Sequence, residues 1–518
     1  KAKPAGTHVT NPALAAFLTR LARQGPRAFY TGSNAAQIAS TVAHAPLNPA
    51  PLTVADIAAY KATPREPLCT RYRGWKLCGM APPSSGATTV FGILGMLERF
   101  DLAALGKDNP TSWHLLAEAE RLAYADRERY LADADFVKVP ARGLIDPGYL
   151  AARSALIAAD RTMATATAGT PPGAGLALAD TFTADVPSTS HFVAIDKAGR
   201  AVSYTSTIES PFGSGLMVNG YYLNNELTDF SLVPTRDGLP VANRVEGGKR
   251  PRSAMSPTLV YDPAGKLRLA VGAAGGTTIP AQVVKAIIAV IDWKLPAREA
   301  IALPVLFAPG DTVFVEKGSS AEGLIAPLTA LGHKVQARDA SFKANAVEIV
   351  GGERHPSADE RARHRALDVT EDALGATDVH LRGDDIADIE TTRGKLWEAM
   401  QQLAAAAHHV LVARQLLDPD RPTRVETPGR DADLGAHAEF AAVGELGRGI
   451  VHQDGAVERV HELRGSGIIL GDNRLGVVRG MAFDMLDRAP HPRHRALAPL
   501  GLQGKLRRLG KPQPLRVT

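Results

Sequence analysis

The sequence predicts a mixed α/β (α+β) fold in which helices cover a core of sheet. Apolar residues recur at helical spacing in the first quarter of the chain, and beyond residue 189 the period changes to two. Helical spacing returns near residue 279. Helices followed by antiparallel strands and then by helices indicate stacked layers around a central sheet.

Four segments before residue 132 are predicted to be helical. Their apolar residues have helical spacing, and the second follows a Thr cap. These segments are 12–23, 52–60, 87–100 and 112–131. The run Pro-Pro-Ser-Ser-Gly at 82–86 is interpreted as a proline turn with an N-cap, and the Ala-, Thr-, Gly- and Pro-rich segment 159–180 as a mobile strip.

Strands and two further helices follow residue 189. Segments 191–195 and 201–208 flank Lys-Ala-Gly as one hairpin, and 258–261 and 267–271 flank Asp-Pro-Ala-Gly as another. The periodicity then predicts helices over 279–293 and 319–331.

The two cysteines are symmetric about a predicted two-residue turn, Arg73-Gly74. Cys69 and Cys78 should therefore face each other across a hairpin, at a separation compatible with a disulfide. Free thiols are nevertheless the preferred expectation, because two cysteines in 518 residues give no disulfide framework.

Composition narrows the classes of function. The net charge of +5 is small for this length, so no basic face for nucleic acid is expected. No apolar run approaches the roughly 18 residues that span a bilayer, and no signal peptide opens the chain, which leaves cytoplasm and periplasm both open. A chain that starts at Lys1 directly before a helix is expected to be the interior of a longer gene product.

Thr189 is the candidate nucleophile, in the run Pro-Ser-Thr-Ser-His. A threonine hydroxyl needs an adjacent base, and a cut at the Ser188–Thr189 bond would supply the α-amine of Thr189, with a pKa of about 7.7–8.0. One residue would then carry both nucleophile and base. The isolated run predicts only the start of a strand, so the argument depends on further motifs.

Those motifs occur in a fixed order from residue 8 to residue 365. Together with Thr189-Ser-His they resemble the γ-glutamyltransferase (glutathione hydrolase) family. They are Tyr-Arg-Gly-Trp at 72–75, Met-Ala-Pro-Pro-Ser-Ser-Gly at 80–86, Ala-Glu-Ala-Glu-Arg-Leu-Ala-Tyr-Ala-Asp at 117–126, Tyr-Thr-Ser-Thr-Ile at 204–208, Leu-Asn-Asn-Glu-Leu-Thr-Asp-Phe-Ser at 223–231, Lys-Arg-Pro-Arg-Ser-Ala-Met-Ser-Pro-Thr at 249–258 and Gly-Ala-Ala-Gly-Gly at 272–276.

The resemblance implies the αββα four-layer sandwich of N-terminal-nucleophile hydrolases, incomplete at its N-terminus. It implies the C-terminal part of a large subunit at 1–188 and a small catalytic subunit at 189–367, which would stay together as a heterodimer after self-cleavage. Residues 368–518 would be an extension without an expected fold. Segment 159–180 would suit a linker that moves away after the cut.

Roles in catalysis follow from the same resemblance. Thr189 would form the γ-glutamyl ester, and Thr207 would hold its amine and hydroxyl in place. Gly275 and Gly276 would stabilise the tetrahedral oxyanion through their backbone amides, because glycine permits close approach of the backbone. Taken alone, Thr207 would be a strand residue and Gly-Gly a turn. No metal or organic cofactor is implied.

Roles in binding the donor also follow from it. Glu226 and Asp229 would bind the donor's α-amino group, since an ammonium offers only hydrogen-bond donors. Ser253 would bind its carboxylate. Taken alone, the two acidic residues would be read as solvated loop charges.

Several departures from the family pattern affect the choice of substrate. Ala254 replaces the second of two serines, and Glu209 stands where many transpeptidases carry asparagine. A carboxylate there would disfavour the donor's carboxylate unless it is turned away or paired. The predicted activity is γ-glutamyl transfer or hydrolysis, with glutathione the expected donor and no nucleic acid or membrane partner. Glutaryl or cephalosporin acylase activity is the alternative.

The start of the chain suggests a third reading. The family carries sheet strands and a donor-binding arginine in a segment before this one, and no residue here matches that arginine. The chain is therefore expected to be a poor catalyst, or a non-catalytic fragment.

The last 150 residues or so resemble no family. Segment 392–417 could form a helix, and it carries His408-His409, whose side chains would point in different directions. His491 and His494 have the spacing of metal ligands but no Cys or carboxylate cluster beside them. These histidines are interpreted as solvated polar residues.

Overall fold

The computed structural model describes residues 7–175, 178–180, 189–196, 198–339, 343–359, 410–412, 469–471 and 474–476. Contacts divide the chain into two units, 1–443 and 444–518, each of which is described by itself. In the second unit, β17 (Ile469–Gly471) pairs with β18 (Arg474–Gly476) in an antiparallel hairpin. Everything below concerns the first unit.

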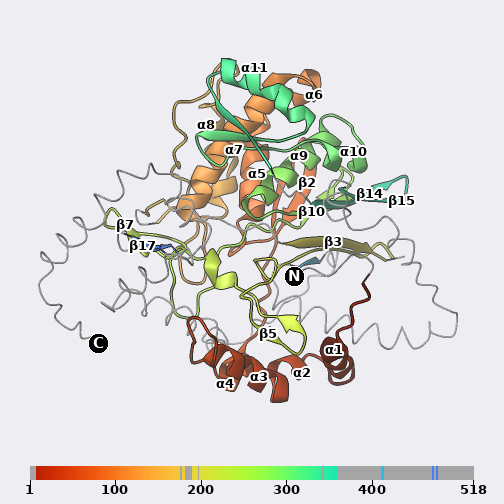
Figure 1. Ribbon diagram of the computed structural model, residues 1–518. Helices are drawn as coiled ribbons and strands as arrows, with labels where there is room; N and C mark the ends of the chain where they lie inside the picture. The colour runs from red at the N-terminus through yellow and green to blue at the C-terminus, as the bar shows by residue number, and fades with distance from the viewer. Residues whose placement is uncertain are drawn as a thin grey trace, which may run out of the picture. The chain divides into compact units, whose positions relative to one another are not determined.

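A six-stranded antiparallel sheet forms the centre of the first unit, in the order β1-β2-β9-β10-β14-β15 (Figure 1). Its first two strands precede residue 189 and the other four follow it, with β2 paired directly to β9. The strands are β1 (Leu68–Tyr72), β2 (Trp75–Gly79), β9 (Thr258–Tyr261), β10 (Leu267–Ala274), β14 (Lys343–Val350) and β15 (Glu353–Ala358).

Helices cover one face of this sheet. α5 (Gly86–Leu97) and α9 (Ile279–Ile291) are apolar on nearly every side. Both are buried in the main hydrophobic core, to which residues of the sheet also contribute. α7 (Pro110–Tyr130) packs against α5 and buries charged residues on its inner side. Smaller elements around them are α6 (Leu102–Leu105), η1 (Gly143–Ile145), α8 (Pro147–Ser154), α10 (Ala297–Ala302), β11 (Leu306–Phe307), β12 (Thr312–Glu316), η4 (Ser320–Leu324), α11 (Ile325–Ala330) and β13 (Lys334–Arg338).

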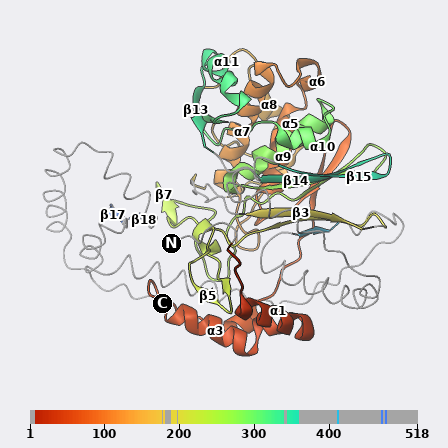
Figure 2. The same ribbon diagram turned by 45° about the vertical axis from the view of Figure 1, so that its right-hand side comes forward.

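A second sheet lies on the opposite face of the first (Figure 2). Its strands β3 (Ser190–Ile195) and β4 (Ala201–Ser206) are antiparallel, and β16 (Val410–Val412) pairs with β4. The two sheets pack closely enough that a Cβ on Gly272 would lie 2.3 Å from Cε1 of His191. Helices, sheet and sheet therefore form three layers of the predicted sandwich.

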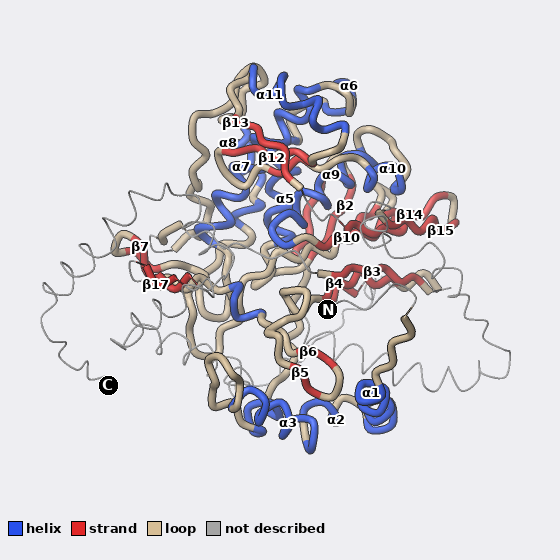
Figure 3. Tube along the Cα trace, viewed as in Figure 1, coloured by secondary structure: helices blue, strands red, loops and turns tan. Residues whose placement is uncertain are grey.

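The N-terminal helices do not supply a fourth layer within the described residues. They pack instead against the hairpin of β5 (Met217–Val218) and β6 (Tyr221–Tyr222) (Figure 3). The helices are α1 (Pro12–Gln24), α2 (Arg27–Tyr30), α3 (Gly32–Ala43) and α4 (Val54–Ala59), and a further short hairpin joins β7 (Thr235–Arg236) to β8 (Leu239–Pro240). In the part of the chain that is described, no helix is both long and apolar enough to span a bilayer.

Most of the predicted elements are confirmed. α1, α4, α5, α7 and α9 and both hairpins lie at the predicted places, and a capping box of Thr53 and Asp56 begins α4, whereas α2 and α3 were not predicted. Segment 319–331 begins as a 3-10 turn before it becomes helical. The helix predicted over 392–417 is wrong at residues 410–412, which form β16; the rest of that segment, His408, His409, His491 and His494 lie outside the described residues.

The cysteine prediction is half right. Cys69 and Cys78 are directly opposed in the β1–β2 ladder, as the turn position predicts. They form a disulfide, so the preference for free thiols is wrong. That preference depended on the length of the chain, whereas the register of the hairpin determines whether the two cysteines can bond.

The idea of a mobile strip over 159–180 is also wrong where the chain is described. Residues 159–175 run along α7 and α8 and are held there by buried side chains. Met163 donates its amide to Glu118 (2.8 Å) and Gly169 donates its amide to Asp126 (2.8 Å). Composition alone missed this, because the bonds come from side chains of distant helices.

Candidate active site

Thr189 lies immediately before β3 and is buried, with 6% of its surface exposed. The β3–β4 ladder pairs Ser190 with Ser206. Thr189 and Thr207 are the next residue beyond this pair on either strand, so the two predicted threonines lie at the same end of the second sheet. Ser188 lies outside the described residues.

A tight turn follows Thr207. Its Oγ1 accepts a hydrogen bond from the amide of Glu209 at 2.8 Å. Glu209 is buried and adopts a φ of 72°, a left-handed conformation that L-residues rarely adopt. Its carboxylate accepts hydrogen bonds from Ser210 Oγ (3.1 Å) and Asn225 Nδ2 (3.2 Å). The negative charge that Glu209 adds to this turn therefore accepts hydrogen bonds from two neutral side chains.

Asn225 ties this turn to the predicted acidic pair. Its backbone amide donates to Ile208 O (3.2 Å), and its Oδ1 accepts from the amide of Ser210 (2.9 Å). The next residues form the 3-10 turn η2 (Glu226–Asp229), in which Glu226 is buried and Asp229 is half-buried. Both predicted acidic residues thus lie in a turn that Asn225 joins to the segment after β4.

A second asparagine extends the path to Ser253. Asn243 Nδ2 donates to Asp229 O (2.7 Å), and Asn243 Oδ1 accepts from the amide of Arg252 (2.9 Å), the residue before Ser253. Hydrogen bonds therefore connect the Thr207 turn, the acidic pair and the predicted carboxylate-binding serine in one continuous path.

Ser253 is buried against the turn at 82–86. Its carbonyl accepts from both the amide and the Oγ of Ser85, each at 2.7 Å, and its amide donates to Pro83 O at 3.1 Å. Ser85 makes no side-chain cap for α5. Ser85 therefore occupies the predicted N-cap position without capping the helix, because its hydroxyl is used to hold the loop of Ser253.

Gly275 and Gly276 follow the end of β10 and lead through η3 (Gly276–Thr278) into α9. Their φ values are 141° and 58°, which favour glycine at both positions. His191, two residues after Thr189, contacts Gly272, three residues before Gly275. The predicted nucleophile and the predicted oxyanion amides therefore lie within a few residues of the same contact between the sheets.

His191 is a neutral residue in this contact. Its Nδ1 lies 2.8 Å from Thr205 Oγ1, and burial lowers the pKa of the imidazole from 6.5 to about 3. A group with so low a pKa is a poor proton acceptor at neutral pH. The imidazole nearest to Thr189 in the sequence is thus unsuited to serve as its base.

The lowered pKa of His191 predicts a loss of stability in acid. Below pH 6.5 the unfolded chain binds a proton at this imidazole while the folded chain does not, so acid favours unfolding. Between pH 6.5 and about 3 the free energy of unfolding should fall, with a slope that approaches about 1.4 kcal/mol per pH unit from this group. The free energy of unfolding, measured with urea at pH 6, 5 and 4, should depend less steeply on pH in His191→Gln than in the wild type, by that amount. Equal dependence on pH in the two proteins would contradict the prediction.

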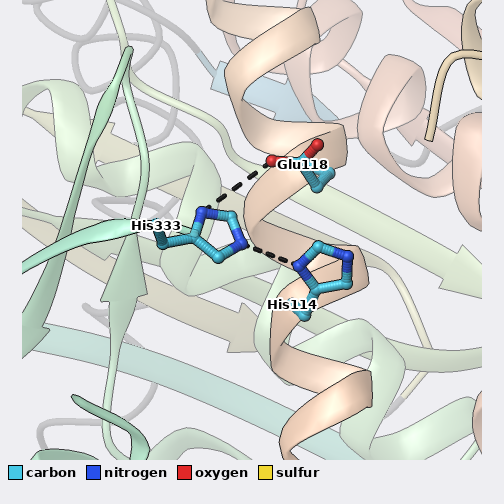
Figure 4. Close-up of side chains that lie close together, drawn as sticks. All are labelled: His114, Glu118 and His333. Carbon is cyan, nitrogen blue, oxygen red and sulfur yellow. Dashed lines mark hydrogen bonds and ion pairs between the residues drawn. The ribbon is translucent and has the colours of Figure 1, made fainter. Parts of the chain in front are cut away.

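One group of side chains has the composition of a metal site: His114, Glu118 and His333, all buried (Figure 4). His114 Nδ1 and His333 Nε2 are 2.7 Å apart, which is a hydrogen-bond distance. Two nitrogens that each lie 2.0–2.1 Å from a tetrahedral zinc would be roughly 3.3 Å apart. Glu118 Oε1 also accepts from Arg121 (2.7 Å). The geometry is that of a hydrogen-bonded network that joins α7 to the start of β13.

The sequence prediction missed the residues that connect the site. Asn225 and Asn243 make no reaction chemistry of their own, and the motifs indicate only the groups that do. Asn225 lies within the motif at 223–231, but no role was predicted for it, although asparagine before a turn commonly bonds to the backbone. Asn243 gave no comparable signal.

Roughly the first 370 residues of the chain are similar to known proteins. A family model described as Gamma-glutamyltranspeptidase matches residues 1–369. The chain is 38% identical over 361 residues to the glutathione hydrolase proenzyme of Escherichia coli (strain K12). This match covers 67% of this chain and 60% of that protein. It is 33% identical over 323 residues to the Acylase ACY 1 proenzyme of Pseudomonas sp. (strain V22), covering 62% and 54%.

A solved structure shows likeness of fold. The cephalosporin acylase from Bacillus halodurans matches with a TM-score of 0.59 at 22% identity, over 69% of this chain and 62% of that one. The chain thus spans between about half and three fifths of the length of the two curated relatives described above.

Proposed function

This chain belongs to the gamma-glutamyltranspeptidase family, and from that premise we propose that it is a self-processing acyltransferase or hydrolase whose nucleophile is Thr189. It would act on γ-glutamyl compounds, with glutathione the expected donor. The observation that supports this most is the register of β3 and β4, which pairs Ser190 with Ser206, the direct neighbours of Thr189 and Thr207. The turn after Thr207 is bonded through Asn225 to the acidic pair.

The proposed reaction begins after the Ser188–Thr189 bond is cut. The freed α-amine of Thr189 accepts the hydroxyl proton, and Oγ1 attacks the γ-carbonyl carbon of the donor. The amides of Gly275 and Gly276 stabilise the negative oxygen of the tetrahedral intermediate. The α-amine then passes its proton to the leaving amine, and water or an acceptor amine resolves the ester by the same steps.

The donor would be held at both ends of its amino acid. Glu226 and Asp229 would accept hydrogen bonds from its ammonium, and Ser253 would donate to its carboxylate. Asn243 links the two groups of residues, because it donates to Asp229 O and accepts from the amide of Arg252, the residue before Ser253.

A glutaryl or cephalosporin acylase remains the second candidate. Ala254 beside Ser253 leaves only one hydroxyl for a carboxylate, and the buried carboxylate of Glu209 lies in the turn next to Thr207. Both features weaken recognition of an α-amino acid. A glutaryl donor has no α-amine and would not need the acidic pair.

Asp229→Asn separates the two candidates. It should weaken turnover of γ-glutamyl-p-nitroanilide by about 1.5–3 kcal/mol, because it removes a hydrogen bond to a charged group. Turnover of glutaryl-p-nitroanilide should be unchanged, since that donor lacks the amine. kcat/KM for both anilides measures the effect. An equal loss on both would remove Asp229 from amine recognition, and a wild-type preference for the glutaryl donor would favour the acylase.

A further inference from the structure

The loop of Gly275 and Gly276 is held from the side of α9 by side-chain donors, each to a successive carbonyl. Gln282 Nε2 donates to Ala274 O at 2.9 Å. Thr278 donates to Gly275 O from its Oγ1 at 2.8 Å and from its amide at 3.2 Å. Both carbonyls at the turn are therefore fixed in direction.

Fixing a carbonyl also fixes the amide of the next residue. A trans peptide is planar, and its C=O and N–H point to opposite sides. A donor that holds Ala274 C=O therefore aims Gly275 N–H away from itself, and Thr278 does the same for Gly276 N–H. These are the two amides that the proposed reaction uses.

From this we infer that Gln282 and Thr278 are positioning residues that aim the amides of Gly275 and Gly276 at the reacting oxygen. The inference rests on the proposed function, since it assigns those amides to the oxyanion. Neither side chain needs to touch the substrate.

The two residues also act on each other. Gln282 Nε2 donates to Thr278 Oγ1 at 3.1 Å, which leaves the threonine hydrogen for Gly275 O. Behind them Tyr124 donates its hydroxyl to Thr277 O at 2.5 Å and is itself buried. The carbonyls of Ala274, Gly275 and Thr277 are thus held by side chains from α9, η3 and α7.

The environment of Gln282 indicates a role other than stability. It lies in a helix that is otherwise almost wholly apolar. Its Oε1 is buried and has no hydrogen-bond partner among the described residues. A buried acceptor without a partner costs free energy. Glutamine at this position is therefore best explained by what its Nε2 holds.

The test uses the full chain and replacements that match the shape of the original side chain. Gln282→Met and Thr278→Val remove the donors, Thr278→Ser keeps the hydroxyl, and Thr277→Val is the matched control in the same turn. Losing an oxyanion donor outright costs about 10²–10³-fold in kcat, so misaiming one should cost roughly 10-fold or more. KM for γ-glutamyl-p-nitroanilide should stay within about twofold, because ground-state binding is untouched.

A second readout does not depend on turnover. Amide hydrogen exchange over 275–278, followed by mass spectrometry, should rise in Gln282→Met and Thr278→Val and stay at the wild-type rate in Thr278→Ser and Thr277→Val. Unchanged exchange in the first two variants, or an unchanged kcat, would overturn the inference. If the wild type turns over no γ-glutamyl anilide and forms no adduct with a boronate, the proposed function fails, and exchange alone then decides whether these residues hold the loop.

Discussion

Thr189→Ala is expected to remain a single chain of 54.7 kDa, while the wild type separates into two fragments under denaturing conditions. The substitution removes the hydroxyl that attacks, so turnover of a γ-glutamyl anilide should fall by roughly 10⁴-fold or more, the scale of losing a nucleophile. Intact mass and N-terminal sequencing measure the cut, which should begin the second fragment at Thr189.

Ser190→Ala is the matched control, since Ser190 is the next hydroxyl along the chain and is exposed. It should be cut and active. A first residue other than Thr189 in the wild-type fragment, or turnover without any cut, would show that the nucleophile has been misassigned.

Glu118→Ala should produce the largest loss of stability. Glu118 is fully buried and accepts from the Arg121 guanidinium (2.7 Å), Thr162 Oγ1 (2.7 Å) and the Met163 amide (2.8 Å). Its removal leaves the buried guanidinium of Arg121 with one counter-charge instead of two, namely that of Asp311 (2.8 Å). Breaking a buried pair in this way costs about 3–5 kcal/mol, which the midpoint of urea unfolding at pH 7 would measure.

Asp160→Ala gives the comparison for Glu118. Its ion pair with Arg161 is exposed on both sides, so the change should stay within about 0.5 kcal/mol. If Glu118→Ala shifts the midpoint no more than Asp160→Ala does, the network of α7 does not stabilise the fold as described.

Local patterns in the sequence were enough to predict most elements of the fold. Helical spacing and caps gave α1, α4, α5, α7 and α9, because a helix is specified within its own segment. Alternation and turn residues gave the two hairpins for the same reason. Pairing between β2 and β9 joins strands about 180 residues apart, and no local pattern reports such a contact.

The site shows the same division. Thr189, Thr207, Glu226, Asp229, Ser253 and the two glycines were marked by motifs, since each carries chemistry of its own. Ser85 and Asn225 lie within the quoted motifs but were given no such role, and Asn243 and Gln282 lie outside the motifs. All four hold other residues, and that role appears only once distant segments lie side by side. Their side chains bond to backbone atoms as far as 168 residues away.

The pairing of β2 with β9 gives the proposed cut a kinetic consequence. Before the cut, folding of this sheet is a first-order event within one polypeptide. Once the chain is divided before Thr189, β2 and β9 belong to separate polypeptides, and reassembly becomes a second-order encounter that depends on concentration. A protein that unfolds after the cut would then lose the high effective concentration that its two parts had within one polypeptide. It would therefore reassemble more slowly than it first folded.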